Sequence, residues 1–338
     1  MRLGFLELPQ EERRLYFEQA AARKNLLPVI MEKDFWVCWL LGVLFGSRFA
    51  DHLVFKGGTS LSKVFGVIAR FSEDIDLSLS PAFLNLPDPG TSRNQADKWM
   101  KRAEAACGEA VKGAVAPELE AAVAAVLGES KGGGWFEFLT DEGTNSPVLL
   151  FHYPSTQPAG FPYLKRSVKL EFGSLTDQQP RGRHAVRPWM AEVIERAFAD
   201  WRCDVVALEV ERTFWEKATI LHAEHHRPAD RPTPDRFSRH YADTAALARH
   251  ASAAAAIDMH DLRERVVRWK GQFFGSSWAR YDLATPGTFR LVPPAERRRA
   301  LERDYGAMRD MYLSDPGTFE DVMATLGALE ARINGASG

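Results

Sequence analysis

Two adjacent glycines, Gly57 and Gly58, lie between a short apolar run and a predicted helix. Glycine lets the backbone turn sharply and approach a ligand closely. The first turn of the following helix offers free N–H groups and a positive dipole end, which together favour a phosphate. Thr59 is expected to cap this helix, and Lys63 lies four residues later on the same helical face. The pattern predicts a phosphate-binding turn, and the alternative is a plain turn between strand and helix.

A pair of carboxylates follows on the next predicted strand. Asp74 and Asp76 are two residues apart, so the alternation of a strand puts both on one face. Adjacent carboxylates repel each other unless a cation lies between them, and hard oxygen ligands suit magnesium. Glu171, on a later predicted strand, offers a third carboxylate, although it could instead form a solvated ion pair with Lys169. The turn and the carboxylates predict a site for in-line phosphoryl or nucleotidyl transfer.

Two further groups of residues are weaker candidates. His222 and His226 share a helical face near His225, but no His-Glu-x-x-His arrangement supports a zinc site. Residues 161–190 include six basic residues and only two acidic ones. This stretch predicts either an approach for RNA or a triphosphate, or a solvated basic loop. The six are Lys165, Arg166, Lys169, Arg181, Arg183 and Arg187.

The composition bounds the class of protein. A chain of 338 residues with 45% hydrophobic and 26% charged residues is expected to form two globular domains. The formal net charge of -2 excludes a strong overall electrostatic field that would attract a nucleic acid or a membrane surface. Three scattered cysteines predict no disulfide framework, which suits the cytoplasm. No secretory signal is recognised, and the longest apolar run, residues 35–46, is too short to span a membrane.

The pattern of apolar residues predicts an α+β fold, with helices first, then a mixed α/β middle and then a helical C-terminal part. Prolines open two N-terminal helices, at Pro9 and Pro28. Strands are predicted at 52–55, 75–79, 135–139, 148–153 and 167–172. Helices are predicted at 59–68 and 91–127, and from about 210 to the end with breaks at 228–234 and 286–294. We expect N-terminal helices packing on the core in 1–50, an α/β domain in 51–205 and a helical domain in 206–338.

The sequence resembles the AbiEii/AbiGii-type nucleotidyltransferase toxins of the polymerase-beta-like nucleotidyltransferase superfamily, which implies a mixed sheet core flanked by helices. The resemblance is carried by VFKGGTSLSKVFGVIARFSEDIDLSLS at residues 54–80. It is supported by EKDFW at 32–36, KLEF at 169–172, ERTFWEK at 211–217 and RHYAD at 239–243. These blocks follow the family's order and cover most of residues 30–250. Threonine stands at position 59, where serine is commoner in the superfamily.

The resemblance implies a role for several residues. Asp74 and Asp76 would hold the catalytic magnesium, with two ions expected, and Gly58 and Thr59 would grip the triphosphate. The implied catalytic set is Asp74, Asp76, Glu171, Lys217 and Asp243, the first three as metal ligands. The nucleotide-binding set is Gly57, Gly58, Thr59, Lys63, Ser72 and Lys169. The alternative for Lys217 is a surface pair with Glu211 or Glu216, and for Asp243 a helical pair with Arg239.

The implied function is a magnesium-dependent nucleotidyltransferase toxin of a type IV-like toxin–antitoxin or abortive-infection system, active in phage defence. It would transfer a nucleotide from a nucleoside triphosphate to an acceptor, expected to be RNA and in particular tRNA. A cognate antitoxin encoded nearby is the expected protein partner, and no membrane partner is expected. Two alternatives stay open: a toxin that binds GTP or another triphosphate without turnover, and nucleotide transfer onto a protein hydroxyl.

Overall fold

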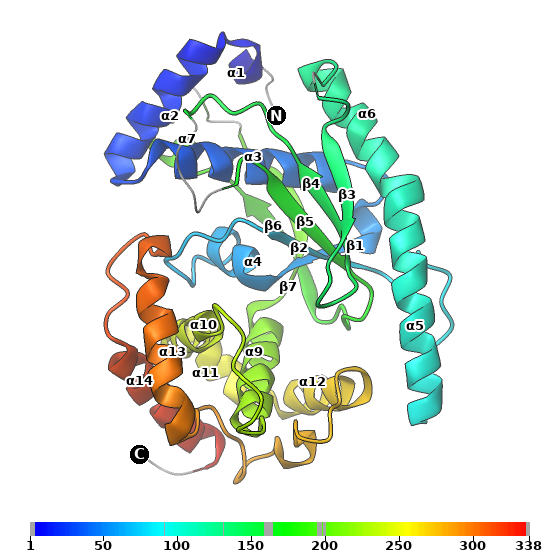
Figure 1. The fold of residues 1–338 in the computed structure, drawn as a ribbon, viewed down its shortest axis with the longest axis vertical. Helices are drawn as coiled ribbons and strands as arrows, with labels where there is room; N and C mark the ends of the chain where they lie inside the picture. The colour runs from blue at the N-terminus through cyan, green and yellow to red at the C-terminus, as the bar shows by residue number, and fades with distance from the viewer. Residues whose placement is uncertain are drawn as a thin grey trace. The chain divides into compact units, whose positions relative to one another are not determined.

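The computed structural model describes residues 4–90, 92–130, 132–158, 165–194, 198 and 201–335. The chain forms two compact units, whose elements are labelled in Figure 1. The first unit comprises Met1–Val64, Ser72–Gly90 and Lys98–Leu208. The second comprises Phe65–Phe71, Thr91–Asp97 and Glu209–Gly338. The N-terminal helices therefore share a unit with the sheet, and the three-part division at residues 50 and 205 stays a prediction.

The first unit is built on a seven-stranded mixed sheet with the order β3-β4-β5-β2-β1-β7-β6. Its strands are β1 Leu53–Lys56, β2 Ile75–Leu79, β3 Phe136–Thr140, β4 Pro147–Phe151, β5 Val168–Gly173, β6 Arg181–Val186 and β7 Cys203–Leu208. Strand β2 pairs antiparallel with β1 and parallel with β5, and β1 pairs parallel with β7. The other pairs are antiparallel. Together with the helices, this mixed sheet confirms the predicted α+β class.

Five of the strands lie where the sequence predicts them, and β6 and β7 were not predicted. Strand β6 is at the edge of the sheet and alternates exposed Arg181 and Arg183 with partly buried residues. Charged side chains on an edge strand protect it from pairing with other chains, and they also hide its apolar pattern. Strand β7 lies next to this edge, between β1 and β6, and its pairing with β1 depends on a contact between segments that are distant in the sequence.

The helices of this part of the chain precede the strands or connect them, and the first residues of α5 belong to the second unit. They are α1 Gly4–Glu7, α2 Gln10–Lys24, α3 Pro28–Phe45, η1 Ala50–His52, α4 Gly57–Lys63, α5 Arg93–Ala110, the π-helical η2 Val111–Val115, α6 Ala116–Leu127 and α7 Met190–Val193. Helix α3 contacts β5 and β7, and α2 packs on α3 (Figure 1). Pro28 occupies the first turn of α3, and most of this helix is buried. The helix that Pro28 was predicted to open is therefore confirmed.

The core of this unit is rich in aromatic rings. Trp36 on α3 stacks on Tyr153 with 5.7 Å between ring centroids, and Trp39 stacks on Phe151 at 5.8 Å. Aromatic pairs at these distances contribute about 0.5–1.5 kcal/mol each beyond the area they bury. These contacts hold α3 against the sheet, so α3 can position the other segments that it contacts.

The helix after the glycines differs from its prediction. Helix α4 spans only Gly57–Lys63, so the predicted extent to residue 68 is wrong. Thr59 is not its cap, because the N-cap residue is Lys56 and Thr59 lies inside the helix. The physical reason is Gly57, whose φ of 81° lets the helix begin directly after β1. The hydroxyl of Thr59 is thereby free to reach the segment that precedes β2.

The second unit is helical. Its elements are α9 Val210–His225, α10 Ser238–Arg249, α11 Ala251–Asp258, α12 His260–Phe273, η3 Tyr281–Leu283, α13 Ala295–Ala307, η4 Arg309–Met311 and α14 Phe319–Ile333. Helix α9 contacts α10, α11 and α12, and α10 also contacts α13 and α14 (Figure 1). The predicted breaks at 228–234 and 286–294 lie between helices, as expected. A capping box of Thr318 and Asp321 begins α14.

Candidate active site

Gly57 and Asp76 lie in direct contact at the start of α4. A Cβ atom added to Gly57 would lie 2.0 Å from Oδ2 of Asp76, a distance at which the two atoms would collide. Gly57 also has a positive φ of 81°, which side chains rarely adopt. Glycine is thus required here for two reasons: the turn needs its positive φ, and the Asp76 carboxylate occupies the space of a side chain. The structure brings the predicted turn and the predicted aspartate together.

The register of the sheet places three of the charged residues in one row. Asp76 on β2 is the backbone partner of Lys56 on β1 and of Glu171 on β5. Partners on neighbouring strands point to the same face, so Asp76 and Glu171 are neighbours on the face opposite Ile75 and its apolar surroundings. This closeness depends on parallel pairing between strands far apart in the sequence.

Asp74 immediately precedes β2 and is partly buried. Burial raises the pKa of Asp74 to about 6, and the negative charges of Asp76 and Glu73 act in the same direction. The positive charges of Lys169 and Lys33 oppose this rise. The excess of negative charge is what a site for a cation requires.

Lys169 and Glu171 form an ion pair on β5. The Lys169 Nζ lies 2.8 Å from Oε2 of Glu171 and 3.4 Å from Oδ2 of Asp141. Burial alone lowers the pKa of Lys169, but the hydrogen bond and charge of Glu171 outweigh it, and the pKa is raised. The pair expected as an alternative is therefore formed. Both side chains are more than a quarter exposed, so substrate could reach them.

The predicted turn residue Thr59 is buried and bonded within the protein. Its Oγ1 donates to the carbonyl oxygen of Asp74 at 2.5 Å and lies 2.8 Å from Oγ of Ser72. Thr59 therefore ties α4 to the segment that carries Asp74. The structure brings Thr59 and Ser72 to the site, where they support the backbone.

Lys63 is also bonded within the protein. Its Nζ lies 2.5 Å from Oδ1 of Asp34, and the two side chains are 4% and 2% exposed. The same ammonium lies 4.5 Å from the ring centroid of Trp189. Lys63 shares α4 with Thr59, as the spacing indicates, but in this structure its charge is directed to α3.

Lys217 and Asp243 meet in the second unit. Lys217 Nζ donates to Oδ2 of Asp243 at 2.8 Å, and Arg70 donates to both carboxylate oxygens at 2.8 Å. All three side chains are less than a tenth exposed. Burial alone would raise the pKa of Asp243, but Arg70 and Lys217 lower it well below its usual range. The motif residues are thus neighbours, and their partner is Arg70 rather than Arg239.

His222 is held by two backbone groups. Its Nε2 lies 2.9 Å from the carbonyl oxygen of Arg280, and its Nδ1 accepts from the N–H of Arg290 at 3.0 Å. Burial lowers the pKa of His222 to about 4, so the ring is neutral at pH 7. These bonds occupy both ring nitrogens and give His222 a structural role.

Three consecutive charged residues of α3 had no predicted role. Glu32, Lys33 and Asp34 are at most 2% exposed, although they lie in the second turn of a strongly apolar helix. Lys33 donates to Glu73, the neighbour of Asp74, and to the carbonyl oxygen of Lys165. The signal that could have found them is the run of three charges before Phe35 and Trp36 in a helix with no polar face.

The carboxylates at the site can be compared with the ligands that magnesium requires. Within the described ranges, no group of three or more His, Cys, Asp or Glu side chains is arranged to hold a metal. Magnesium usually keeps several waters and binds one or two carboxylates together with substrate phosphates. Asp74 and Asp76 meet that need, whereas Glu171 would first have to release Lys169. The two aspartates fit magnesium in the presence of a nucleotide.

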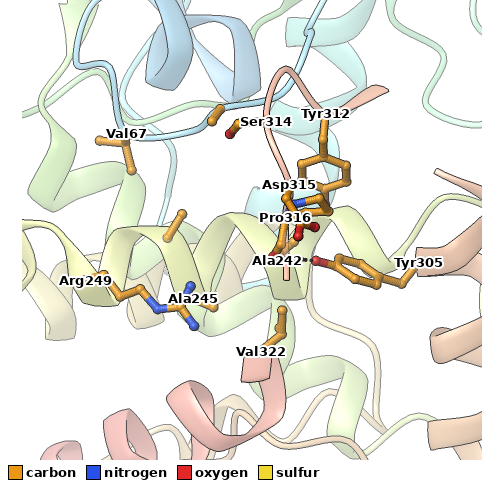
Figure 2. Close-up of a pocket in the computed structure, with 12 residues that line it drawn as sticks. Val67, Ala242, Ala245, Arg249, Tyr305, Tyr312, Ser314, Asp315, Pro316 and Val322 are labelled. Carbon is orange, nitrogen blue, oxygen red and sulfur yellow. Dashed lines mark hydrogen bonds between the residues drawn. The ribbon is translucent and has the colours of Figure 1, made fainter. Parts of the chain in front are cut away.

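The second unit also contains a pocket, which Figure 2 shows. It has a volume of about 260 Å³, and its lining includes Ala242, Arg249 and Tyr305. Arg249 already donates to Oγ1 of Thr325 at 2.7 Å, and the Tyr305 hydroxyl donates to the carbonyl oxygen of Pro316 at 3.0 Å. Its lining contains none of the predicted site residues. The pocket therefore plays no part in the site.

Comparison with known proteins identifies the family. The family model described as "Nucleotidyl transferase AbiEii toxin, Type IV TA system" matches residues 39–325. Among solved structures, MenT4, a nucleotidyltransferase toxin from Mycobacterium tuberculosis H37Rv, matches with 18% sequence identity and a TM-score of 0.35, over 89% of this chain and 99% of that one. No curated protein matches. No helix in the described part of the chain is long and apolar enough to cross a membrane. Because the family model covers most of its length, the chain belongs to the AbiEii nucleotidyltransferase toxins of type IV toxin–antitoxin systems.

Proposed function

We propose that this nucleotidyltransferase is magnesium-dependent and transfers a nucleotide from a nucleoside triphosphate to a hydroxyl of RNA, with tRNA as the expected acceptor. The observation that carries the proposal is the contact between Gly57 and the Asp76 carboxylate. This contact puts a turn whose backbone can closely approach a phosphate beside the acidic face of β2. A protein that only binds a partner has no need of that combination.

Asp74 and Asp76 are the proposed metal ligands, with two magnesium ions expected. Bound there, magnesium would polarise the α-phosphate and stabilise the leaving pyrophosphate. The burial and repulsion that raise the pKa of Asp74 support this assignment, because a divalent cation would relieve both. Glu171 is proposed as a third ligand that becomes available when Lys169 turns to the substrate.

The other site residues have proposed roles toward the nucleotide. The N–H groups that begin α4 at Gly57 and Gly58 have no side-chain cap and would donate to the triphosphate. Thr59 and Ser72 would hold this turn against the Asp74 segment. Lys169 would contact the phosphates, and Lys63 would act by holding α4 in place.

The transfer step conserves atoms and charge. The acceptor hydroxyl oxygen attacks the α-phosphorus, and the bond from that phosphorus to the pyrophosphate oxygen breaks. The hydroxyl proton passes to a neighbouring carboxylate, for which Glu171 or one of the aspartates is the proposed base. The pyrophosphate leaves with the electron pair of the broken bond.

Exposed basic residues support RNA as the acceptor. Lys165 and Arg166 are exposed beside β5, and Arg181 and Arg183 alternate along the edge strand β6. Arginine and lysine side chains in such positions bind the phosphates of a nucleic acid without regard to its sequence. A protein acceptor would not require this charge.

The acceptor is tested with purified protein, magnesium, labelled nucleoside triphosphates, and total RNA and total protein. The proposal predicts label in a band of tRNA size. Label in a protein band would favour transfer onto a protein hydroxyl, and nucleotide binding without pyrophosphate release would favour a non-catalytic toxin. Asp51→Asn is the control for the loss of a carboxylate charge in Asp76→Asn, because Asp51 is exposed and lies 3.6 Å from Arg183.

The family implies a cognate antitoxin and a nucleoside triphosphate substrate. We extend this to a cytoplasmic toxin that stops growth and acts in phage defence, neutralised by an antitoxin encoded nearby. Expression of the chain alone should stop growth, and expression with the neighbouring gene should restore it. Growth arrest by Asp76→Asn at the same protein level would contradict a toxicity that depends on transfer.

A further inference from the structure

The three charged residues in the second turn of α3 connect this helix to three separate segments of the first unit. Glu32 accepts from the backbone N–H of Thr156 at 2.6 Å and from its hydroxyl at 2.8 Å. Asp34 accepts from Lys63 and from the N–H of Trp189, at 2.5 and 2.6 Å. Lys33 lies between them and points to Glu73. Each of the three therefore positions a different segment.

Lys33 is the member that acts on the site. Its side chain is 2% exposed, and that of Glu73 is 20% exposed. An ammonium group buried to this extent is tolerated only with a charged partner and further hydrogen bonds. Lys33 has both, because it also donates to the carbonyl oxygen of Lys165 at 2.9 Å. Its position is therefore fixed by α3 and two acceptors.

The Asp74 segment is held from two sides. Thr59 on α4 donates to the backbone carbonyl of Asp74, and Lys33 on α3 donates to the side chain of the preceding residue, Glu73. The backbone of Asp74 then has little freedom to move. A carboxylate that must meet a metal and a phosphate needs to be held within roughly 0.5 Å by such supporting contacts.

We propose that Lys33 is a positioning residue for nucleotidyl transfer: through Glu73 it fixes the segment that presents the Asp74 carboxylate to the metal and the nucleotide. This inference rests on the proposed function of Asp74 and Asp76. Lys33 does not itself contact the substrate, because its ammonium is buried and both of its acceptors belong to the protein. Its role is to keep the Asp74 segment in a fixed position relative to the Gly57 turn.

The test compares Lys33→Met with Glu32→Gln. Both remove a buried charge from neighbouring positions of α3, but Glu32 holds residues 155–156, which carry no proposed site residue. With the full chain, Lys33→Met should lower kcat about tenfold or more while the KM for the nucleoside triphosphate changes less than about threefold, since a 1.4 kcal/mol loss is tenfold. Glu32→Gln should leave kcat within about twofold, and Lys33→Arg should recover part of the lost rate.

A second readout does not depend on turnover. Calorimetry with Mn²⁺ and a non-hydrolysable triphosphate analogue should show Mn²⁺ binding weakened about fivefold or more by Lys33→Met and unchanged by Glu32→Gln. Glu73→Gln should weaken it similarly. The double variant should be no worse than either single variant, because both changes remove one interaction.

The outcomes separate this inference from the function on which it rests. If Asp76→Asn abolishes transfer and Lys33→Met leaves both kcat and Mn²⁺ binding like those of Glu32→Gln, the positioning role is overturned and the function stands. If the wild type neither transfers a nucleotide nor binds Mn²⁺, the proposed function fails and the inference fails with it. Loss of Mn²⁺ binding in Lys33→Met with normal thermal unfolding would establish the role.

Discussion

At the scale of single residues, the contact of Gly57 with Asp76 defines the site. The carboxylate occupies the space in which any other residue would place its side chain. The same glycine permits the turn that begins α4 directly after β1. One missing side chain therefore determines both the position of the acid and the position of the N–H groups beside it.

Gly57→Ala is expected to abolish transfer. Its Cβ would displace the Asp76 carboxylate, and its φ of 81° adds backbone strain of about 1 kcal/mol or more. Gly66→Ala is the matched control, because Gly66 has a φ of 62° and nothing within 4 Å of an added Cβ. Transfer assays and thermal unfolding of both variants separate strain from displacement. A fully active Gly57→Ala would contradict the role of this contact.

Asp243 is expected to be essential for the stability of the second unit. Asp243→Asn would leave Arg70 and Lys217 as two buried cations without a countercharge. Breaking a buried ion pair from one side destabilises by about 3–5 kcal/mol. Chemical unfolding followed by circular dichroism should show this loss, and Arg239→Met on the same helix should show almost none. If Asp243→Asn keeps wild-type stability but loses transfer, Asp243 acts in the chemistry instead.

At the scale of elements, the sequence predicted the strands that carry the site better than their arrangement. Strand β2 was predicted with its observed bounds, because the alternation around Ile75 and Leu77 is a local pattern. The pairing of Asp76 with Glu171 was not predictable, since it depends on β2 and β5 becoming parallel neighbours. Lys33 was missed for the same reason, because its partner Glu73 is distant in the sequence.

The junction between α4 and the Asp74 segment depends on one hydroxyl. Thr59→Val keeps the shape of the side chain but removes the hydrogen bond to the Asp74 carbonyl and leaves that acceptor without it. We expect a loss of about 1–3 kcal/mol in the free energy of unfolding and a lower kcat. Thr59→Ser should keep both near the wild-type values. Equal loss in the serine and valine variants would show that the methyl group, and not the bond, is what matters.

At the scale of the whole molecule, burial of a neutral histidine makes stability depend on pH. The folded pKa of His222 is about 4, below its usual value of 6.5. This contribution is therefore complete above pH 6.5 and is lost as the pH falls toward 4, because the unfolded chain binds the proton more readily. From pH 7 to 5 the loss is about 2 kcal/mol.

Unfolding with denaturant at pH 7 and pH 5 measures this effect. His222→Gln keeps a donor for the carbonyl oxygen of Arg280 and has no charge to gain, so its loss over this range should be smaller than that of the wild type by about 2 kcal/mol. The same pH dependence in both proteins would place the titrating group elsewhere.

The most direct test of the site is transfer of label from nucleoside triphosphate to RNA by the wild type, Asp76→Asn and Asp51→Asn across a range of magnesium concentrations. Incorporation should require magnesium in the wild type and in Asp51→Asn, and it should fall at least about a hundredfold in Asp76→Asn. Equal incorporation by Asp76→Asn and the wild type would contradict the proposed role of Asp76.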